Sequence, residues 1–222
     1  MNRSAHFWFQ TILFAAALLV SVMAYPHLPE QVPVHWNFAG EADRLGTKLE
    51  MLTVGPAIIF LITLLGPLMR RIDPMAFNYE KFTSTYQTVM SSIVAFFFVI
   101  QLTSIAIGLG VPLRVNYLVP VGVGLLFMIL GNVMPRMRQN YFMGIRLPWT
   151  LADRDIWAKT HRLGGRIFVA GGFGMIAIGM LTPFISETLG MALFLTVILS
   201  LLLVPIIYAW WLFQKRGKGQ LN

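Results

Sequence analysis

Six long apolar stretches, separated by segments rich in polar residues, dominate the pattern along the chain. Each stretch has close to the roughly 20 residues that an α-helix needs to cross the hydrocarbon core of a bilayer. Because that core offers no water to exposed backbone groups, a spanning segment satisfies its own hydrogen bonds by forming a helix. The pattern therefore predicts an all-α integral membrane protein with six transmembrane helices, at about residues 7–25, 51–69, 88–110, 117–134, 167–185 and 191–213.

Two polar connections, residues 26–50 and 135–166, are longer than the others. Long polar loops usually carry what a membrane protein presents to its partners. No convincing internal repeat is present, so the inverted-repeat architecture of many transporters is not indicated. We expect four parts: the first two helices with the 26–50 loop (1–69), the third helix with its flanking loops (70–116), a region that contains the 135–166 loop (117–213), and a basic tail (214–222).

Composition and the placement of charge agree with this reading and add an orientation. Hydrophobic residues make up 57% of the chain and charged residues 12%, and the mean hydropathy is +0.70. Of the 17 Lys and Arg residues, 14 lie in alternate segments, with 1 before the first helix, 3 in 70–87, 7 in 135–166 and 3 in the tail. Basic loops are retained in the cytoplasm. The sequence predicts a multi-pass plasma-membrane protein with both termini cytoplasmic, and the +8 charge reflects topology rather than nucleic-acid binding.

The first apolar stretch has an alternative interpretation as a cleaved signal peptide. Arg3 precedes it, and Val22-Met23-Ala24 resembles a small-residue cleavage site. Its apolar run is longer than the roughly 7 to 15 residues of a signal peptide, so a retained helix is favoured. The chain has no Cys, which excludes disulfides, thiolate metal sites and Cys nucleophiles.

The 26–50 loop is expected to be ordered and to lie outside the cell. Pro26, Pro29 and Pro33 fix φ and remove N–H donors, so the segment should begin extended. Residues 32–38 suit a short strand before a turn at Gly40. We therefore expect a structured cover over the helix ends.

A divalent-metal site in this loop is a weaker alternative. His27, Glu30, His35 and Asp43 are all of types that ligate zinc. Their spacing matches no established motif, and a solvated proline-rich loop accounts for them. No metal and no cofactor are expected.

The 135–166 loop is expected to contain a short helix on the cytoplasmic membrane surface. Thr150 with Asp153 three residues later resembles a capping box in which a carboxylate replaces Glu or Gln, and it predicts a helix over about 151–163. Gly164-Gly165 offers a left-handed cap before the fifth spanning helix.

Other residues support this short helix and its place. Asp155 and Lys159 are an i,i+4 ion pair. Trp149 and Trp157 suit the headgroup layer, where amphipathic rings gather.

Glycines recur every seven residues in the fifth spanning helix. Gly165, Gly172 and Gly179 should lie on one face, where another helix can approach closely. Helix packing is the favoured explanation.

Candidate catalytic chemistry is sparse. No Asp, Glu, Lys or Arg falls within the predicted hydrocarbon layer, and Gln101 is the most polar side chain near a helix centre. Ion-coupled transport commonly uses intramembrane carboxylates or His, so it is disfavoured. His161 with Asp153 or Asp155 could act as a base, but no nucleophile motif accompanies it. We expect no enzyme and name no catalytic residue.

The two long loops carry patterns that resemble a known family. The pattern of the 135–166 loop resembles the signature of the SdpI family of bacterial immunity proteins, and the 26–50 loop resembles the domain of unknown function that often precedes that signature. The first pattern consists of Gly131-Asn132, Pro135, Asn140-Tyr141-Phe142-Met143-Gly144-Ile145-Arg146, Pro148-Trp149-Thr150-Leu151, Trp157 and Thr160-His161-Arg162-Leu163-Gly164-Gly165. The second consists of Pro33-Val34-His35-Trp36-Asn37, Gly40, Asp43 and Lys48.

The resemblance implies a multi-spanning plasma-membrane protein that protects its producer from a secreted, membrane-damaging peptide toxin. For the best-known member it also implies signalling, in which the toxin-engaged protein retains a small transcriptional repressor at the cytoplasmic face. The outer candidates for partner binding are Pro33, His35, Asn37, Gly40, Asp43 and Lys48. The inner candidates are Asn140, Gly144, Arg146, Pro148, Trp149, Thr150, Trp157, Thr160, His161 and Gly164.

Transport of a small molecule or lipid by the same fold is the alternative function, and substrate-dependent flux in vesicles would favour it. An intramembrane or interfacial enzyme comes third, and turnover that is lost in His161→Ala would support it. The Arg residues of the 135–166 loop can also bind anionic headgroups, so membrane lipids are expected partners.

Overall fold

The six predicted spans are present in a computed structural model that describes residues 3–219. Within these residues, six helices are long and apolar enough to cross a membrane. They are α1 (Arg3–Ala24), α2 (Lys48–Ile72), α3 (Thr83–Gly108), α4 (Val115–Val133), α6 (Arg154–Leu181) and α7 (Glu187–Gly219). The shorter elements are α5 (Pro148–Ala152), the strands β1 (Gln31–Trp36) and β2 (Ala42–Thr47), and the 3-10 turns η1 (Tyr25–His27), η2 (Ala76–Phe82), η3 (Met134–Arg136) and η4 (Thr182–Phe184).

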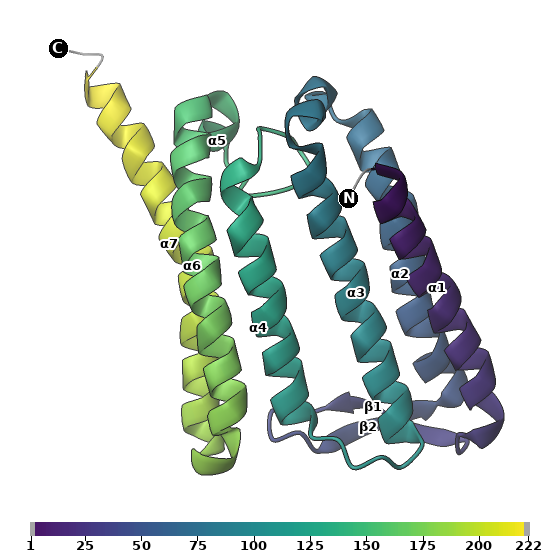
Figure 1. Cartoon of the computed structure of the whole chain (residues 1–222). Coiled ribbons are helices and arrows are strands. Elements are labelled where there is room, and N and C mark those ends of the chain that lie inside the picture. The colour runs from purple at the N-terminus through teal and green to yellow at the C-terminus, as the bar shows by residue number, and fades with distance from the viewer. Residues whose placement is uncertain (1–2, 220–222) are drawn as a thin grey trace.

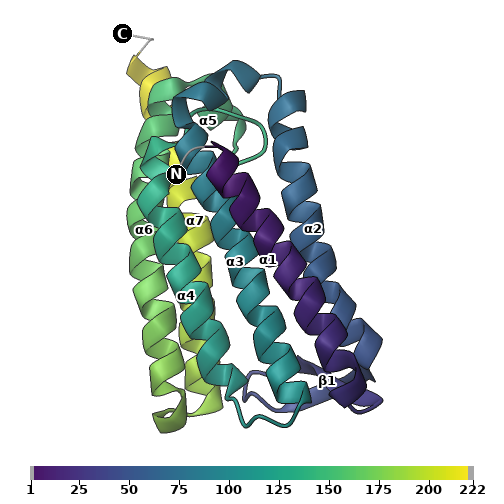
Figure 2. The same cartoon turned by 45° about the vertical axis from the view of Figure 1, so that its right-hand side comes forward.

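The helices form two groups that stand side by side (Figures 1 and 2). Helices α1, α2 and α3 pack against one another, and α6 packs against both α4 and α7. The start of α1, the end of α7 and α5 lie at one end of the bundle, and the strands lie at the other (Figure 1). We call these the termini end and the hairpin end. Which of them faces the cytoplasm stays a prediction.

Apolar side chains cover the outward faces of the helices, as a lipid environment requires. Leu61, Leu64 and Leu199 are each at least half exposed. The predicted basic tail, residues 214–222, is not separate from the last helix, because α7 continues to Gly219. The last part of that tail, residues 220–222, lies outside the described residues.

The 26–50 loop is an antiparallel β-hairpin. The strand predicted over residues 32–38 is present as β1, and it pairs with β2, which the sequence did not reveal. The predicted turn is confirmed, because Gly40 has a φ of 84°, a conformation that glycine adopts without a Cβ penalty. Val32 is fully buried and packs with Leu28 and Met51, so the hairpin closes over the ends of the first three helices.

Helices α4 and α6 approach closely through glycines. A Cβ on Gly165 would lie 2.6 Å from the carbonyl oxygen of Gly131, and one on Gly172 would lie 2.6 Å from that of Gly124. Gly179 faces the carbonyl of Tyr117. The prediction of a glycine face for close helix packing is confirmed, and α4 is the partner.

The predicted surface helix over 151–163 is wrong as a separate element. The chain forms only one short turn of helix, α5, and then α6 runs without interruption from Arg154 to Leu181. Gly164 and Gly165 are helical rather than a left-handed cap. Gly165 meets the backbone of α4, so helix packing decides its conformation instead of the local capping pattern.

The predicted capping box is wrong for the same segment. Asp153, not Thr150, is the N-cap of α6, and its carboxylate accepts hydrogen bonds from the backbone N–H groups of Asp155 (2.8 Å) and Ile156 (3.1 Å). The predicted i,i+4 ion pair between Asp155 and Lys159 is confirmed at 2.8 Å.

Candidate functional site

Residues 137–147, which we call the junction loop, connect η3 to α5 without regular secondary structure and are organised by Asn140. Its side chain is fully buried. The amide nitrogen donates to the carbonyls of Arg138 (2.8 Å) and Met143 (3.0 Å). The amide oxygen accepts from the N–H groups of Phe142 (3.0 Å) and Met143 (2.6 Å). One side chain thus replaces the backbone ladder that a helix or sheet would supply.

Asp73 ties the junction loop to the first helix group. Its carboxylate is buried, and one oxygen accepts hydrogen bonds from the Tyr79 hydroxyl (2.8 Å) and the Tyr141 N–H (2.9 Å). The other oxygen accepts from the N–H of Met75 at 2.7 Å. Three donors satisfy this charge, as burial requires.

A second bond joins the same two regions. The Asn78 side chain donates to the Gln139 carbonyl at 2.9 Å. Sequence reasoning missed Asp73, Asn78 and Gln139. Asp73 stands directly after an apolar span and before Pro74, which was the available signal, but its partner lies 68 residues away.

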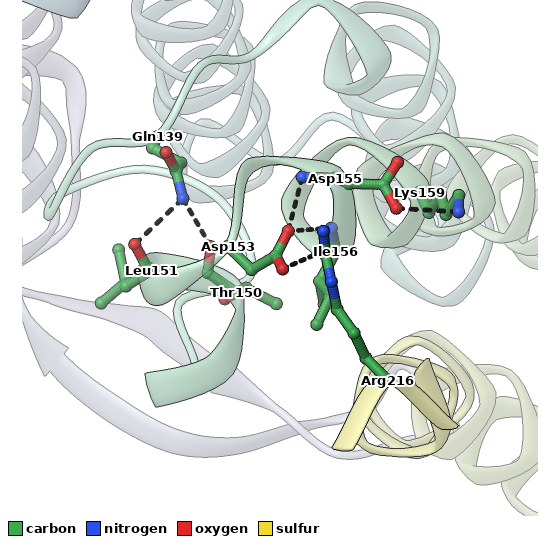
Figure 3. A network of polar contacts seen from close by, with 8 residues as sticks. All are labelled: Gln139, Thr150, Leu151, Asp153, Asp155, Ile156, Lys159 and Arg216. Atoms are coloured by element: carbon green, nitrogen blue, oxygen red, sulfur yellow. Dashed lines mark hydrogen bonds and ion pairs between the residues drawn. The ribbon is translucent and has the colours of Figure 1, made fainter. Parts of the chain in front are cut away.

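Gln139 and Thr150 fix the two ends of the junction loop to α5. The Gln139 amide nitrogen donates to the carbonyls of Thr150 and Leu151, both at 2.9 Å (Figure 3). The Thr150 hydroxyl accepts from the Leu147 N–H (2.8 Å) and contacts the Ile145 carbonyl as a donor (2.8 Å). Thr150 is fully buried, so its hydroxyl holds the chain and is not presented to a partner.

His161 holds the middle of the junction loop. Its Nε2 accepts a hydrogen bond from the Ile145 N–H at 3.0 Å, so the proton of the neutral ring is on Nδ1, which donates to the Trp157 carbonyl at 2.8 Å. The ring is fully buried and stacks on Trp157, with the centroids 4.0 Å apart. Because both nitrogens serve backbone groups, His161 is not paired with Asp153 or Asp155 as a catalytic base would be.

Gly144 permits this contact. It has a φ of 101°, and a Cβ there would lie 2.3 Å from Nε2 of His161. Gly164 meets the side chains of Ile145 and Met134 in a similar way. Trp157 completes the core by donating its indole N–H to the Met137 carbonyl at 2.9 Å.

The remaining candidates of this loop lie at its edge. Arg146 is exposed, and its guanidinium donates to the Tyr141 carbonyl at 2.6 Å. Pro148 is exposed, and Trp149 stacks on Phe213 of α7 with the centroids 5.9 Å apart.

Two polar groups at this end are buried without a partner within the part of the chain that the structure describes. They are the indole nitrogen of Trp149 and the hydroxyl of Thr160.

Trp157 lies inside the protein and not in the headgroup layer, contrary to the prediction.

Asp153 also joins α6 to α7, because its carboxylate pairs with Arg216 (Figure 3). Burial alone would raise the pKa of this carboxyl. The N–H donors of Ile156 and Asp155, together with Arg216, outweigh that effect and hold the pKa below its ordinary value.

At the hairpin end, His35 and Asp43 are exposed, and the other outer candidates, Pro33, Asn37, Gly40 and Lys48, are partly buried. Nδ1 of His35 lies 2.6 Å from Asp43, and their side chains are 64% and 42% exposed. Lys48 pairs with Glu30 at 2.7 Å. These two pairs occupy three of the four residues considered for a metal site, Glu30, His35 and Asp43. The fourth residue is His27.

The tip of the hairpin is anchored to the second helix group. Asn37 accepts from the N–H of Glu41 at 2.9 Å, which shapes the turn. Gly40 packs on Asn116, whose amide donates to the Ala39 carbonyl at 2.9 Å. Phe38 contacts Phe194 of α7 with the centroids 6.0 Å apart. Pro33 lies within β1 opposite Leu45.

The structure therefore separates the candidates into two sets. Those of the 135–166 region gather around the junction loop at the termini end, and those of the 26–50 region lie on or beside the hairpin at the opposite end (Figure 1). The two sets do not form one site.

Comparison with known proteins gives matches to both regions. Residues 136–209 match the SdpI/YfhL protein family, and residues 12–60 match a domain of unknown function, DUF1648. The chain is 27% identical over 198 residues to the Immunity protein SdpI of Bacillus subtilis, which covers 86% of this chain and 88% of the relative. It is 40% identical over 77 residues to an uncharacterized protein of Archaeoglobus fulgidus, covering 32% and 42% of the two chains. No solved structure matches significantly.

Proposed function

This chain belongs to the SdpI/YfhL family, and on that premise we propose that it is a membrane immunity protein that protects its producer from a secreted, membrane-active peptide toxin. The relative of known name is an immunity protein and aligns over most of both chains. The match includes both long loops, so it is not confined to apolar helices whose composition alone could produce similarity.

The observation that carries the proposal is the form of the hairpin end. His35 and Asp43 are exposed, yet the hairpin that bears them is fixed by Val32 in the core and by Asn116 on α4. A rigid surface loses little conformational entropy when a partner binds. We propose that this surface faces the outside and meets the toxin.

The orientation is a proposal that single cysteines can test, since the chain has none of its own. Ala42 on the hairpin and Ala152 at the termini end are both exposed. In intact cells, an impermeant maleimide should label Ala42→Cys and leave Ala152→Cys unlabelled until the membrane is opened. The reverse pattern would contradict the proposed orientation.

Deletion of the gene tests the immunity function itself. Cells without it should become more sensitive to at least one secreted membrane-active peptide, and expression of the chain from a plasmid should restore resistance. Complementation with a stable variant that carries changes at both His35 and Asp43 should restore less. Unchanged sensitivity across a broad peptide panel would contradict the proposal.

We further propose that the exposed edge of the junction loop can hold a small soluble repressor at the cytoplasmic face. Tyr141 and Arg146 are exposed on a loop whose shape is fixed from inside by Asn140, and Pro148 is exposed beside them at the start of α5. Arg146→Ala should weaken retention of such a protein at the membrane, and Arg162→Ala, which removes another exposed charge at the same end, should not. Equal retention by both variants would contradict this role for Arg146.

A further inference from the structure

A crevice of about 570 Å³ opens at the termini end among α1, α2 and α3. Its walls combine apolar and polar side chains from all three helices and from η2. They include His6, Pro67, Arg70, Arg71, Glu80, Gln87 and Met90. Such a mixture suits a ligand with one charged end and one apolar end.

Two adjacent guanidinium groups line this crevice. Arg70 is half-buried and Arg71 is exposed, and neither guanidinium forms a hydrogen bond or ion pair with another residue in the range 3–219. Glu80 is the one carboxylate in the lining, so the crevice keeps an excess of positive charge. The nearby Asp73 does not neutralise it by direct contact, because its oxygens are engaged by Met75, Tyr79 and Tyr141.

Side-chain hydrogen bonds between the helices fix the walls of this crevice. Ser91 of α3 is bonded by both His6 (3.0 Å) and Gln10 (3.1 Å) of α1, and all three side chains are buried. These bonds fix the wall that α1 shares with α3. On the opposite side, Tyr86 donates its hydroxyl to the Gly66 carbonyl at 2.6 Å and fixes α3 to α2.

Two other crevices of similar size lack this charge. One of about 570 Å³ lies among α1, α3 and α4, and one of about 550 Å³ lies between α1 and α2 toward the hairpin end. No Lys or Arg of the described chain lines either of them. Apolar lipid chains could enter all three, but only the crevice with Arg70 and Arg71 offers a counter-charge to an anion.

We propose that this crevice binds an anionic phospholipid, with its phosphate held by Arg70 and Arg71 and an acyl chain lying past Pro67 and Met90. A guanidinium presents planar N–H donors that match phosphate oxygens, and it is more weakly hydrated than an ammonium group. The polar side chains of His6 and Gln87 suit the glycerol region. The bound lipid would hold the ends of three helices together independently of any toxin.

Native mass spectrometry of the purified protein with added phosphatidylglycerol or phosphatidylcholine tests the proposal. The wild type should retain phosphatidylglycerol at least about tenfold more strongly, since the choline ammonium of phosphatidylcholine cancels the net charge of that headgroup and is repelled by the two arginines. The double variant Arg70→Gln, Arg71→Gln should lose this preference. The control Arg162→Gln, Arg166→Gln removes the same charge from exposed positions on α6 and should keep it.

Two further measurements distinguish a whole phospholipid in the crevice from a small anion held by the two arginines. Gln87→Trp fills the crevice without a change of charge and should reduce retention of both lipids. Glycerophosphoglycerol, the soluble headgroup, should not compete with phosphatidylglycerol, because it lacks the acyl chain.

Three results would each overturn the proposal. They are retention of phosphatidylglycerol by the Arg70, Arg71 variant at the wild-type level, an equal loss in the Arg162, Arg166 control, and displacement of the lipid by the soluble headgroup. Lipid retention is measured without any peptide toxin, so its outcome is independent of the immunity function.

Discussion

The hairpin and the junction loop solve the same problem, ordering a polar segment at the end of a helix bundle, in opposite ways. The hairpin uses a backbone ladder between β1 and β2, so side chains such as His35 and Asp43 remain exposed. The junction loop has no ladder, and buried side chains such as Asn140 and His161 supply its hydrogen bonds. A distinctive polar residue therefore means different things at the two ends. In the junction loop Asn140 and His161 build the fold, and on the hairpin the side chains of His35 and Asp43 are exposed to a partner.

The most damaging substitution should be the one that removes the side chain organising the junction loop. Asn140→Ala leaves two partly buried N–H groups and two carbonyls without their partner, so we expect a loss of about 3 kcal/mol in the free energy of unfolding. Thermal unfolding of the purified protein in detergent measures it. Tyr141→Ala, which removes a 43% exposed side chain beside it, is the control and should change stability much less. Equal stability of Asn140→Ala and the wild type would remove the contrast between the two ends.

A pair of glycines isolates the role of His161. Both Gly144 and Gly110 have positive φ values, 101° and 87°, but a Cβ on Gly110 would meet nothing within 4 Å. Gly110→Ala should cost about 1 kcal/mol through backbone strain alone, and Gly144→Ala should cost at least about 2 kcal/mol because it also displaces His161. Chemical denaturation of the two variants gives the difference. Equal costs would mean that the contact with His161 contributes nothing.

A smaller effect is expected at Asp153, which is partly exposed at the termini end. Its pKa is lowered in the folded protein, so its stabilising contribution is present above the pKa of the unfolded chain and is lost as the pH falls through the folded value. Asp153→Asn keeps a capping oxygen but loses the charge, so it should cost less than about 1 kcal/mol at neutral pH. The gap between variant and wild type should close toward about pH 3. A gap that widens on acidification would reverse the sign of this contribution.

The hairpin should tolerate substitution with the least change in stability. His35→Ala should change the free energy of unfolding by less than about 0.5 kcal/mol, because an exposed pair contributes little. It should nevertheless reduce protection against the toxin. Arg44→Ala, which breaks the exposed pair with Glu50 on the same hairpin, is the matched control and should leave the dose response unchanged. An effect of Arg44→Ala as large as that of His35→Ala would point to general charge on the hairpin.

The parts of the fold that the sequence predicted depend on local patterns. Apolar length was sufficient for the six spans, and a seven-residue glycine repeat was sufficient for the close face of α6. The helix end expected at Gly164 is absent because glycine is typical both of a helix C-cap and of close helix packing. Here the close approach of α4 favours packing, and α6 continues. The contact between Asp73 and the N–H of Tyr141 was not predictable, since it depends on how the two helix groups pack.

The sequence pattern identified the candidate residues but not their roles. It allowed His161 as a base, and the ring in fact supports the backbone of Ile145. It placed Trp157 at the headgroups, and this side chain is 2% exposed under the junction loop. Sequence alone cannot assign these roles because each depends on which buried backbone group lies nearby.

If the junction loop builds the fold and the hairpin recognises the partner, Asn140 and His35 should behave in opposite ways in one assay. That assay is the toxin dose response, measured per folded molecule in membranes. We predict that Asn140→Ala lowers protection only in proportion to its loss of folded protein, whereas His35→Ala lowers protection at an unchanged folded amount. Full protection by His35→Ala, together with lost protection by a normally folded Asn140→Ala, would contradict this division.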